Sequence, residues 1–238
     1  MAILKPYLAR LNPIQRQGVL KAWQYPVSDA SGFNRHNLLI ARQQLLKAGY
    51  TFQNGRLLDR KAKPIQIEFL IHQEGLQRTL MPFIRNMKRL GIDVAIRQVD
   101  VPQYIERMRS KDFDMTTSVM PQSLNPGNEQ AQFWGSASAD QAGNYNYSGI
   151  KNAVIDAVVQ QVIQAPDREQ LVLRTKVLDR LLRAGYYQIP TYGKGENWFA
   201  YWNMYHQPKV KPKLSSGIDY WWSDAEQAKK VTHYLRQQ

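Results

Sequence analysis

The chain has 238 residues and a mass of 27.6 kDa, which allows one large domain or two small ones with a sizeable core. Apolar residues make up 43% of it and charged residues 21%, and this composition argues against wholesale disorder. The lack of cysteine excludes disulfides, thiolate metal sites and a cysteine nucleophile. No stretch approaches the ~20 consecutive apolar residues that are needed to span a bilayer.

Net charge is the one extreme value, because 32 Lys and Arg residues against 19 Asp and Glu residues give +13. A basic chain suggests nucleic acid as a partner. The densest basic groups, at 56–63 and 229–230, are short and interrupted, and no zinc-finger spacing, RNP-type motif or basic heptad accompanies them. We therefore expect no nucleic acid as the main partner. A basic interaction or nucleic-acid-binding module stays as the alternative, which a salt titration distinguishes.

The first quarter of the chain predicts a connecting segment, a helix and a hairpin. Residues 1–33 are rich in proline and turn-forming residues, which indicates an irregular connecting segment with one short helix at about 14–22. Apolar residues recur at helical spacing over 35–48, and Asn34 is placed to cap that helix. The Asn-Gly pair at 54–55 predicts a turn or hairpin.

The middle of the chain predicts an α/β domain. Residues 65–71 and 92–96 alternate between apolar and polar side chains, as strands with one buried face do, and a helix at 77–90 separates them. Such a strand–helix–strand unit has a right-handed crossover in nearly all proteins. A short helix begins near Pro102, and 113–119 reads as a third strand. The order of the elements predicts a mainly parallel sheet flanked by helices.

The last half of the chain mixes loop, helix and aromatic segments. Residues 120–149 are irregular and rich in Asn, Gly, Ser and Gln, and loops of this length are usually functional or mobile. Two helices are expected at 151–164 and 167–183. Residues 186–222 hold 11 aromatic residues, a density that suits strands and loops facing a groove or, alternatively, a packed aromatic core.

No catalytic or metal-binding motif stands out. The four histidines are far apart in sequence and lack metal-ligand spacing. Asp112 and Asp114 flank Phe113 and would share one face of a strand, but a solvated strand end explains them better than a paired-carboxylate site. We expect no enzyme activity and no cofactor. A hydrolase acting on peptides or sugars is disfavoured, because neither a triad nor a carboxylate pair is present.

The segment 35–50, which ends in Ala48-Gly49-Tyr50, resembles a helix and turn in solute-binding proteins of the peptide/nickel ABC-importer family, known as family 5. Four further segments follow that family's order: 90–92, 99–104, 111–114 and 144–149. The resemblance implies an α/β fold, the second lobe of a type II periplasmic binding protein. Since members are well over twice this length, it also implies that the first lobe and the signal peptide lie outside this chain.

A narrower resemblance concerns residues 122–136 and 221–224. They are similar to the branch that binds oligopeptides and the peptide-nucleotide antibiotic microcin C. The implied function is the substrate-binding component, here a fragment, of an importer that takes up such compounds from the periplasm. The implied partners are the peptide and, through the full-length protein, an inner-membrane permease and ATPase, with the binding protein a monomer. The implied division is a connecting segment at 1–33, a ligand-binding lobe at 34–195 and a segment at 196–238 that returns toward the first lobe.

Peptide receptors accept varied side chains, so amides, backbone groups and aromatic walls supply most contacts. The candidates in the loop are Gln122, Asn125, Asn128, Glu129, Gln130, Trp134, Asn144, Tyr145 and Asn146. Two alternatives stay open: the amides bond only within the loop, since Asn and Gly favour turns, or Trp134 merely anchors it.

Charged groups are expected at the ends of a bound peptide. Many relatives place an aspartate just after the third strand to hold the peptide amine, but residues 120–126 contain no acid. Glu129 is the candidate for that role. Arg78, near the start of a helix, is the candidate for a ligand carboxylate, because a helix N-terminus and an arginine both favour an anion. A solvated arginine is the alternative.

Overall fold

The computed structural model describes residues 3–21, 24–191, 198–212, 215 and 217–237. The chain forms two compact units, Met1–Gln188 and Ile189–Gln238, which are described separately below. None of the helices in the described residues is long and apolar enough to cross a membrane.

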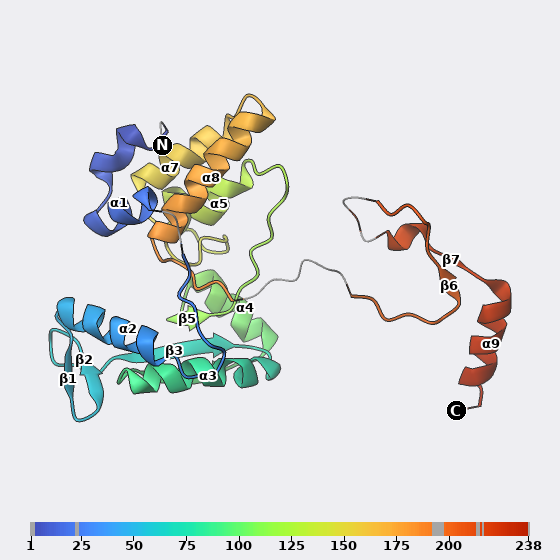
Figure 1. The fold of residues 1–238 in the computed structure, drawn as a ribbon, viewed down its shortest axis with the longest axis horizontal. Coiled ribbons are helices and arrows are strands. Elements are labelled where there is room, and N and C mark those ends of the chain that lie inside the picture. The colour runs from blue at the N-terminus through green and yellow to red at the C-terminus, as the bar shows by residue number, and fades with distance from the viewer. Residues whose placement is uncertain (1–2, 22–23, 192–197, 213–214, 216, 238) are drawn as a thin grey trace. The chain divides into compact units, whose positions relative to one another are not determined.

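A three-stranded parallel sheet lies at the centre of the α/β part of the first unit (Figure 1). The strands β3 (Gln66–Ile71), β4 (Asp93–Gln98) and β5 (Met115–Thr116) follow the order β4-β3-β5. The helix α3 (Gly75–Arg89) connects β3 to β4, and α4 (Val101–Ser110) connects β4 to β5. The predicted β-α-β-α-β series and its parallel sheet are therefore confirmed.

The third strand is shorter than the predicted 113–119 at both ends, and carboxylates account for its late start. Asp114 accepts the backbone N–H of Glu68 at 2.8 Å, so a side chain occupies a position that a longer β5 would fill. Arg107 binds Glu68 at 2.6 Å and Asp112 at 2.9 Å. The two aspartates that flank Phe113 thus hold the strand end in place, and neither forms a paired-carboxylate site with the other.

One face of the sheet is covered by α3 and by α2 (Arg35–Lys47), whose cap Asn34 accepts the N–H of Asn37 at 3.2 Å. The hairpin of β1 (Thr51–Gln53) and β2 (Arg56–Leu58) extends this layer. Its two-residue turn has Asn54 and Gly55 at positive φ, 49° and 77°, as the predicted Asn-Gly hairpin requires. The buried core of this part comprises Leu57, Phe69, Ile71, Leu80, Leu90, Ile92 and Val94.

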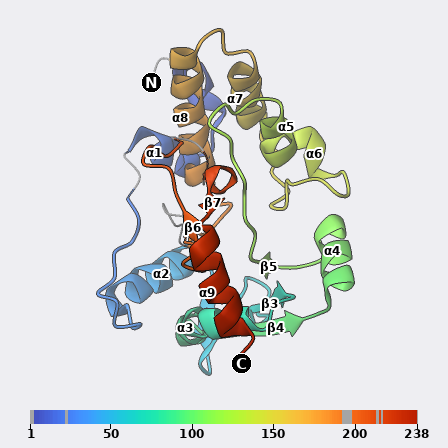
Figure 2. The same ribbon diagram turned by 90° about the vertical axis from the view of Figure 1, so that its right-hand side faces the viewer.

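A second core in the same unit is helical. The helices α7 (Ala153–Ile163) and α8 (Arg168–Ala184) form its centre, close to the two predicted ranges. In both views α5, α7 and α8 cluster together, apart from the sheet (Figures 1 and 2). The cap Asp167 accepts the N–H of Gln170 at 2.8 Å, as expected for this capping pattern.

Residues 1–33 contribute to this helical core. They contain η1 (Lys5–Arg10) and α1 (Pro13–Leu20), and their buried side chains are Leu4, Leu11 and Val19. The close approach of α1 to α8 depends on Gly18, because a Cβ there would lie 2.8 Å from the Cβ of Ala184. The domain boundaries proposed after residues 33 and 195 stay predictions.

The second unit contains little regular structure in its described residues. Its elements are the antiparallel pair β6 (Tyr205–His206) and β7 (Trp222–Ser223), η2 (Ile218–Tyr220) and α9 (Ala225–Leu235). The ring of Trp221 packs against those of Phe199 and Tyr201, but most other aromatic side chains described in this unit are exposed. The described part of this segment is therefore not a packed aromatic core.

Candidate functional site

The carboxyl ends of β3 and β5 lie side by side. The two strands pair in parallel through Leu70 and Thr116, and β4 lies on the other side of β3. The crossover through α3 leads from β3 to β4, and the crossover through α4 leads back past β3 to β5, so the two run in opposite directions across the sheet. In open α/β sheets, ligands bind outside the carboxyl ends of the strands at such a switch point. The residues that directly follow β3 and β5 are the first candidates for ligand contact.

His72 follows β3 directly and lies against Tyr104 of α4. Their ring centroids are 4.4 Å apart, with the planes inclined by 42°. The Tyr104 hydroxyl donates to the carbonyl of Thr117, just beyond β5, at 3.0 Å. The Nδ1 atom of His72 is buried and has no hydrogen-bond partner among the described residues. His72 was not among the candidates predicted from the sequence, although its position one residue after a predicted strand could have indicated it.

The loop that follows β5 is held by hydrogen bonds from a buried amide, that of Gln130. The Gln130 amide donates to the side-chain oxygen of Gln122 at 2.7 Å, and its own oxygen accepts the indole N–H of Trp134 at 3.0 Å. Gln130 is 3% exposed and Trp134 is 8% exposed. The indole therefore anchors the loop, which is the alternative that the sequence left open for it.

Part of the segment 120–149 is helical, so the expectation of an irregular loop was wrong over that part. The short helices α5 (Glu129–Trp134) and α6 (Ser136–Ala139) occupy its middle. Phe133 and Trp134 belong to the helical core, and their burial explains why this polar segment folds there.

The outer part of the loop presents amides to solvent. Gln122, Asn125 and Asn128 are exposed. Arg168, at the start of α8, donates to the side-chain oxygen of Asn125 at 2.7 Å and to the carbonyl of Leu124. The loop is thus fixed by Gln130 at one point and by Arg168 at another, while its exposed amides face outward.

Glu129 is a half-buried carboxylate at the start of α5. One of its oxygens accepts the N–H of Gly127 at 2.9 Å and the amide of Gln130 at 3.2 Å. Burial, the largest single influence, would raise the pKa of this carboxyl. Backbone N–H groups and the Gln130 amide together outweigh it and lower the pKa of Glu129 below its ordinary value. The group is therefore an anion near neutral pH.

Three further candidates lie beyond α6, and the structure separates their roles. Asn146 is 1% exposed; its amide donates to the carbonyls of Gly135 and Ile150, and its oxygen accepts the N–H of Ile150. Asn144 donates to the carbonyl of Gln141 at 2.7 Å and to that of Ser138. These two amides bond within the loop. Tyr145 is 47% exposed, and its ring packs 5.2 Å from that of Phe133.

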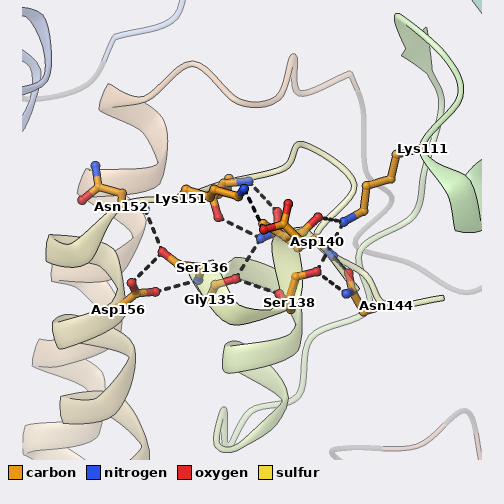
Figure 3. Close-up of polar contacts among 12 residues, drawn as sticks. Lys111, Gly135, Ser136, Ser138, Asp140, Asn144, Lys151, Asn152 and Asp156 are labelled. Carbon is orange, nitrogen blue, oxygen red and sulfur yellow. Dashed lines mark hydrogen bonds and ion pairs between the residues drawn. The ribbon is translucent and has the colours of Figure 1, made fainter. Parts of the chain in front are cut away.

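Figure 3 shows the polar junction that holds this part of the loop. Asp156 of α7 accepts the N–H of Ser136 at 2.7 Å and its hydroxyl at 2.6 Å. Lys111, which follows α4, donates to the carbonyl of Ser138 at 3.3 Å and to that of Ala139. Burial is the main cause of a lowered pKa at Lys111. The junction ties the end of α4 to α6 and α7, and its ionic groups already have partners.

Arg78 lies apart from the loop candidates. It is an exposed residue of α3, the helix whose N-terminus follows β3 at the same edge of the sheet. Among the described residues, no hydrogen bond or ion pair joins it to the loop. The structure therefore brings together Gln122, Glu129, Gln130 and Trp134, forms a second group around Asn144 and Asn146, and leaves Arg78 on its own helix.

Among the described residues, no group of three His, Asp or Glu side chains is placed to hold a metal ion.

The chain is similar to bacterial binding proteins. It is 42% identical over 203 residues to the protein named "Probable peptide-binding protein YejA" of Agrobacterium fabrum. This match covers 84% of this chain and 33% of the relative. It is 34% identical over 197 residues to the "Peptidoglycan-binding protein YepA" of the same organism, which covers 83% of this chain and 32% of that protein. The chain thus spans about one third of the length of these relatives. No family model matches it.

Solved structures share the fold. The oligopeptide-binding protein AppA of Bacillus subtilis, in complex with a nonapeptide, matches with a TM-score of 0.58 at 18% identity, over 78% of this chain and 40% of that one. NikZ of Campylobacter jejuni, in complex with Ni(L-His), matches with a TM-score of 0.56 at 12% identity, over 77% of this chain and 42% of that one.

Together, the parallel sheet, its flanking helices and these matches define an α/β lobe of a type II periplasmic binding protein. By sequence the chain is similar to bacterial binding proteins, among them the probable peptide-binding protein YejA, and by fold it is similar to AppA and NikZ. The expectation that it is not an enzyme is confirmed, because its homologues are binding proteins.

Proposed function

We infer that this chain is a ligand-binding lobe of a periplasmic protein that captures oligopeptides for an ABC importer. One observation carries this function: the loop that follows β5 begins at the switch point of the sheet and has exposed amides that are held by hydrogen bonds to other residues. Gln122 is held by Gln130, and Asn125 is held by Arg168. A rigid row of amide donors and acceptors suits the repeating N–H and C=O groups of a peptide.

The remaining candidates have complementary chemistry. Glu129 is an anion beside this row and suits a peptide amine, while the exposed Arg78 suits a carboxylate. Tyr145 offers a half-exposed aromatic wall. We add His72 to the ligand contacts for two reasons. The residue follows β3 at the switch point, and its buried Nδ1 has no hydrogen-bond partner among the described residues.

The ligand class has two finer candidates. The resemblance to the oligopeptide and microcin C branch supports peptides or peptide-like compounds such as microcin C. The relative named for binding peptidoglycan supports peptides derived from the cell wall as the second candidate. In the whole protein, a ligand would stabilise a closed form by touching both lobes, and that form would engage the permease and ATPase. Residues 196–238 would return toward the other lobe, and the protein would act as a monomer.

Nuclear magnetic resonance titration of the isotopically labelled chain with oligopeptides tests this function. We expect weak, saturable shifts at the backbone and side-chain amides of Gln122, Asn125 and Asn128, because the chain supplies only one side of the cleft. The substitutions Gln122→Ala and Asn125→Ala should weaken them, whereas Gln132→Ala, an exposed control in α5, should not. Tight binding measured by calorimetry would contradict the partial cleft, and the absence of shifts in the loop would contradict the site.

A further inference from the structure

The outer surface of the layer formed by α2 and α3 is strongly basic. Both helices pack on the same face of the sheet, since each contributes side chains to one core with Phe69 and Ile71. They lie next to each other at one end, where the guanidinium of Arg89 stacks 4.0 Å from the ring of Phe33. This surface, made of the exposed residues of α2 and α3, is called the cationic layer below.

Neither helix of the cationic layer contains an acidic residue. The cations of α2 and α3 are Arg35, Arg42, Lys47, Arg78, Arg85, Lys88 and Arg89, and all of them are exposed. The adjoining hairpin and turn add Arg56, Arg60, Lys61 and Lys63 against the single acid Asp59. The carboxylate of Asp59 already accepts the backbone N–H groups of Lys61 and Lys63. More than half of the net charge of +13 therefore lies on this one part of the fold.

Large apolar side chains are exposed between these cations. On α2, Leu39 is 50% exposed and Leu46 is 46% exposed. Together with Arg35 and Arg42 they follow steps of four, three and four residues, so they form one stripe along the helix. On α3, the exposed Met81 lies between Arg78 and Arg85 in the same way. Cations thus alternate with apolar side chains along both helices.

We propose that the cationic layer binds the surface of a membrane that is rich in anionic phospholipid. Lys and Arg on such a surface attract anionic headgroups, and leucine and methionine between them insert at the boundary between headgroups and acyl chains. A nucleic acid would bind through the cations alone. The exposed aliphatic side chains would contribute to binding only on a lipid surface, so they favour lipid as the partner. Apart from Arg78, the residues of this surface do not belong to the proposed peptide site, so the proposal goes beyond that function and does not depend on it.

Co-sedimentation of the 238-residue chain with vesicles tests the proposal. We expect binding to vesicles of equal parts phosphatidylglycerol and phosphatidylcholine, weakening with salt, and little binding to pure phosphatidylcholine. The double variant Arg35→Glu and Arg85→Glu should bind at least about 25-fold less tightly, at about fivefold per removed charge. The matched control is Lys5→Glu with Lys176→Glu, which changes the net charge equally at exposed sites elsewhere and should bind far more tightly than the first pair.

A second pair separates lipid from other polyanions. Leu39→Ser with Leu46→Ser keeps every charge and should weaken vesicle binding several-fold, while the circular dichroism spectrum shows that the helices are intact. Three results would overturn the proposal: no binding to the anionic vesicles, an equal loss in the two charge pairs, or unchanged vesicle binding by the leucine pair. Binding of a single-stranded oligonucleotide that matches the vesicle affinity and is indifferent to the leucine pair would assign the surface to nucleic acid instead.

Discussion

The indole N–H of Trp134 donates to the side-chain oxygen of Gln130 at 3.0 Å, and both residues are almost completely buried. The amide nitrogen of Gln130 reaches in the other direction to Gln122, at 2.7 Å, on the surface loop. An internal residue therefore determines where an exposed amide lies. This relationship links the stability of the helical core to the position of the proposed peptide contacts.

Replacing Gln130 with leucine should destabilise the protein by about 1–3 kcal/mol, because the buried indole N–H of Trp134 loses its acceptor. The same change at Gln132, an exposed residue of the same helix, should alter the free energy of unfolding by no more than about 0.5 kcal/mol. Urea denaturation of both variants measures the difference. Equal effects of the two substitutions would mean that the hydrogen bonds of Gln130 contribute nothing to the free energy of unfolding.

Asn146→Ala should be destabilising by about 2–3 kcal/mol. Its amide makes three hydrogen bonds to the backbone at Gly135 and Ile150, and the substitution leaves these buried groups without partners. Asn128→Ala is the matched control, because that side chain is exposed and does not cap α5. If Asn146→Ala reduced peptide binding without a change in stability, its role would be at the ligand and not within the loop.

The contribution of Glu129 to stability should depend on pH. Its pKa in the folded protein is lowered from the ordinary value of 4.5, so the ionised group stabilises the fold above that pH. As the pH falls through the lower folded value, this contribution is lost. Glu129→Gln should therefore be more destabilising at pH 6 than in more acidic solution below the folded pKa. Asn128→Ala, which removes no titratable group, should show the same effect at both pH values, and a Glu129→Gln effect that grew in acid would contradict the prediction.

Gly91→Ala should destabilise the protein by about 3 kcal/mol or more. Gly91 has a φ of 72°, and a Cβ there would lie 2.6 Å from the backbone nitrogen of Leu57. Gly55 has a similar φ of 77° but no atom within 4 Å of the added Cβ. Gly55→Ala should therefore cost only the conformational term, about 1 kcal/mol. Thermal or urea unfolding of the pair separates backbone strain from the steric clash.

Much of the fold could be predicted because its signals are local. Asn34 and Asp167 precede apolar residues at helical spacing, and both cap their helices in the structure. The Asn54-Gly55 hairpin follows from the same kind of signal, since both residues adopt positive φ. The helices α5 and α6 could not be predicted, because six and four residues are too few to establish a period and their burial comes from packing on distant helices.

The candidate site could be predicted in its composition and not in its orientation. An Asn or Gln in a loop reads the same whether it faces solvent, as Asn125 does, or the interior, as Asn146 does. Orientation depends on contacts far along the chain, such as that of Arg168 with Asn125. His72 was missed for a similar reason: its proximity to Tyr104 and Thr117 arises only when β5 pairs with β3.

Covalent capture of a weakly bound peptide locates the contact surface most directly. An oligopeptide carrying a photoreactive benzophenone side chain, irradiated with the chain and mapped by mass spectrometry, should label residues between 120 and 128 together with Tyr145. An excess of the unmodified peptide should suppress that labelling. Labelling that is confined to α7 and α8, or that persists undiminished in the presence of competitor, would contradict a peptide wall at the carboxyl edge of the sheet.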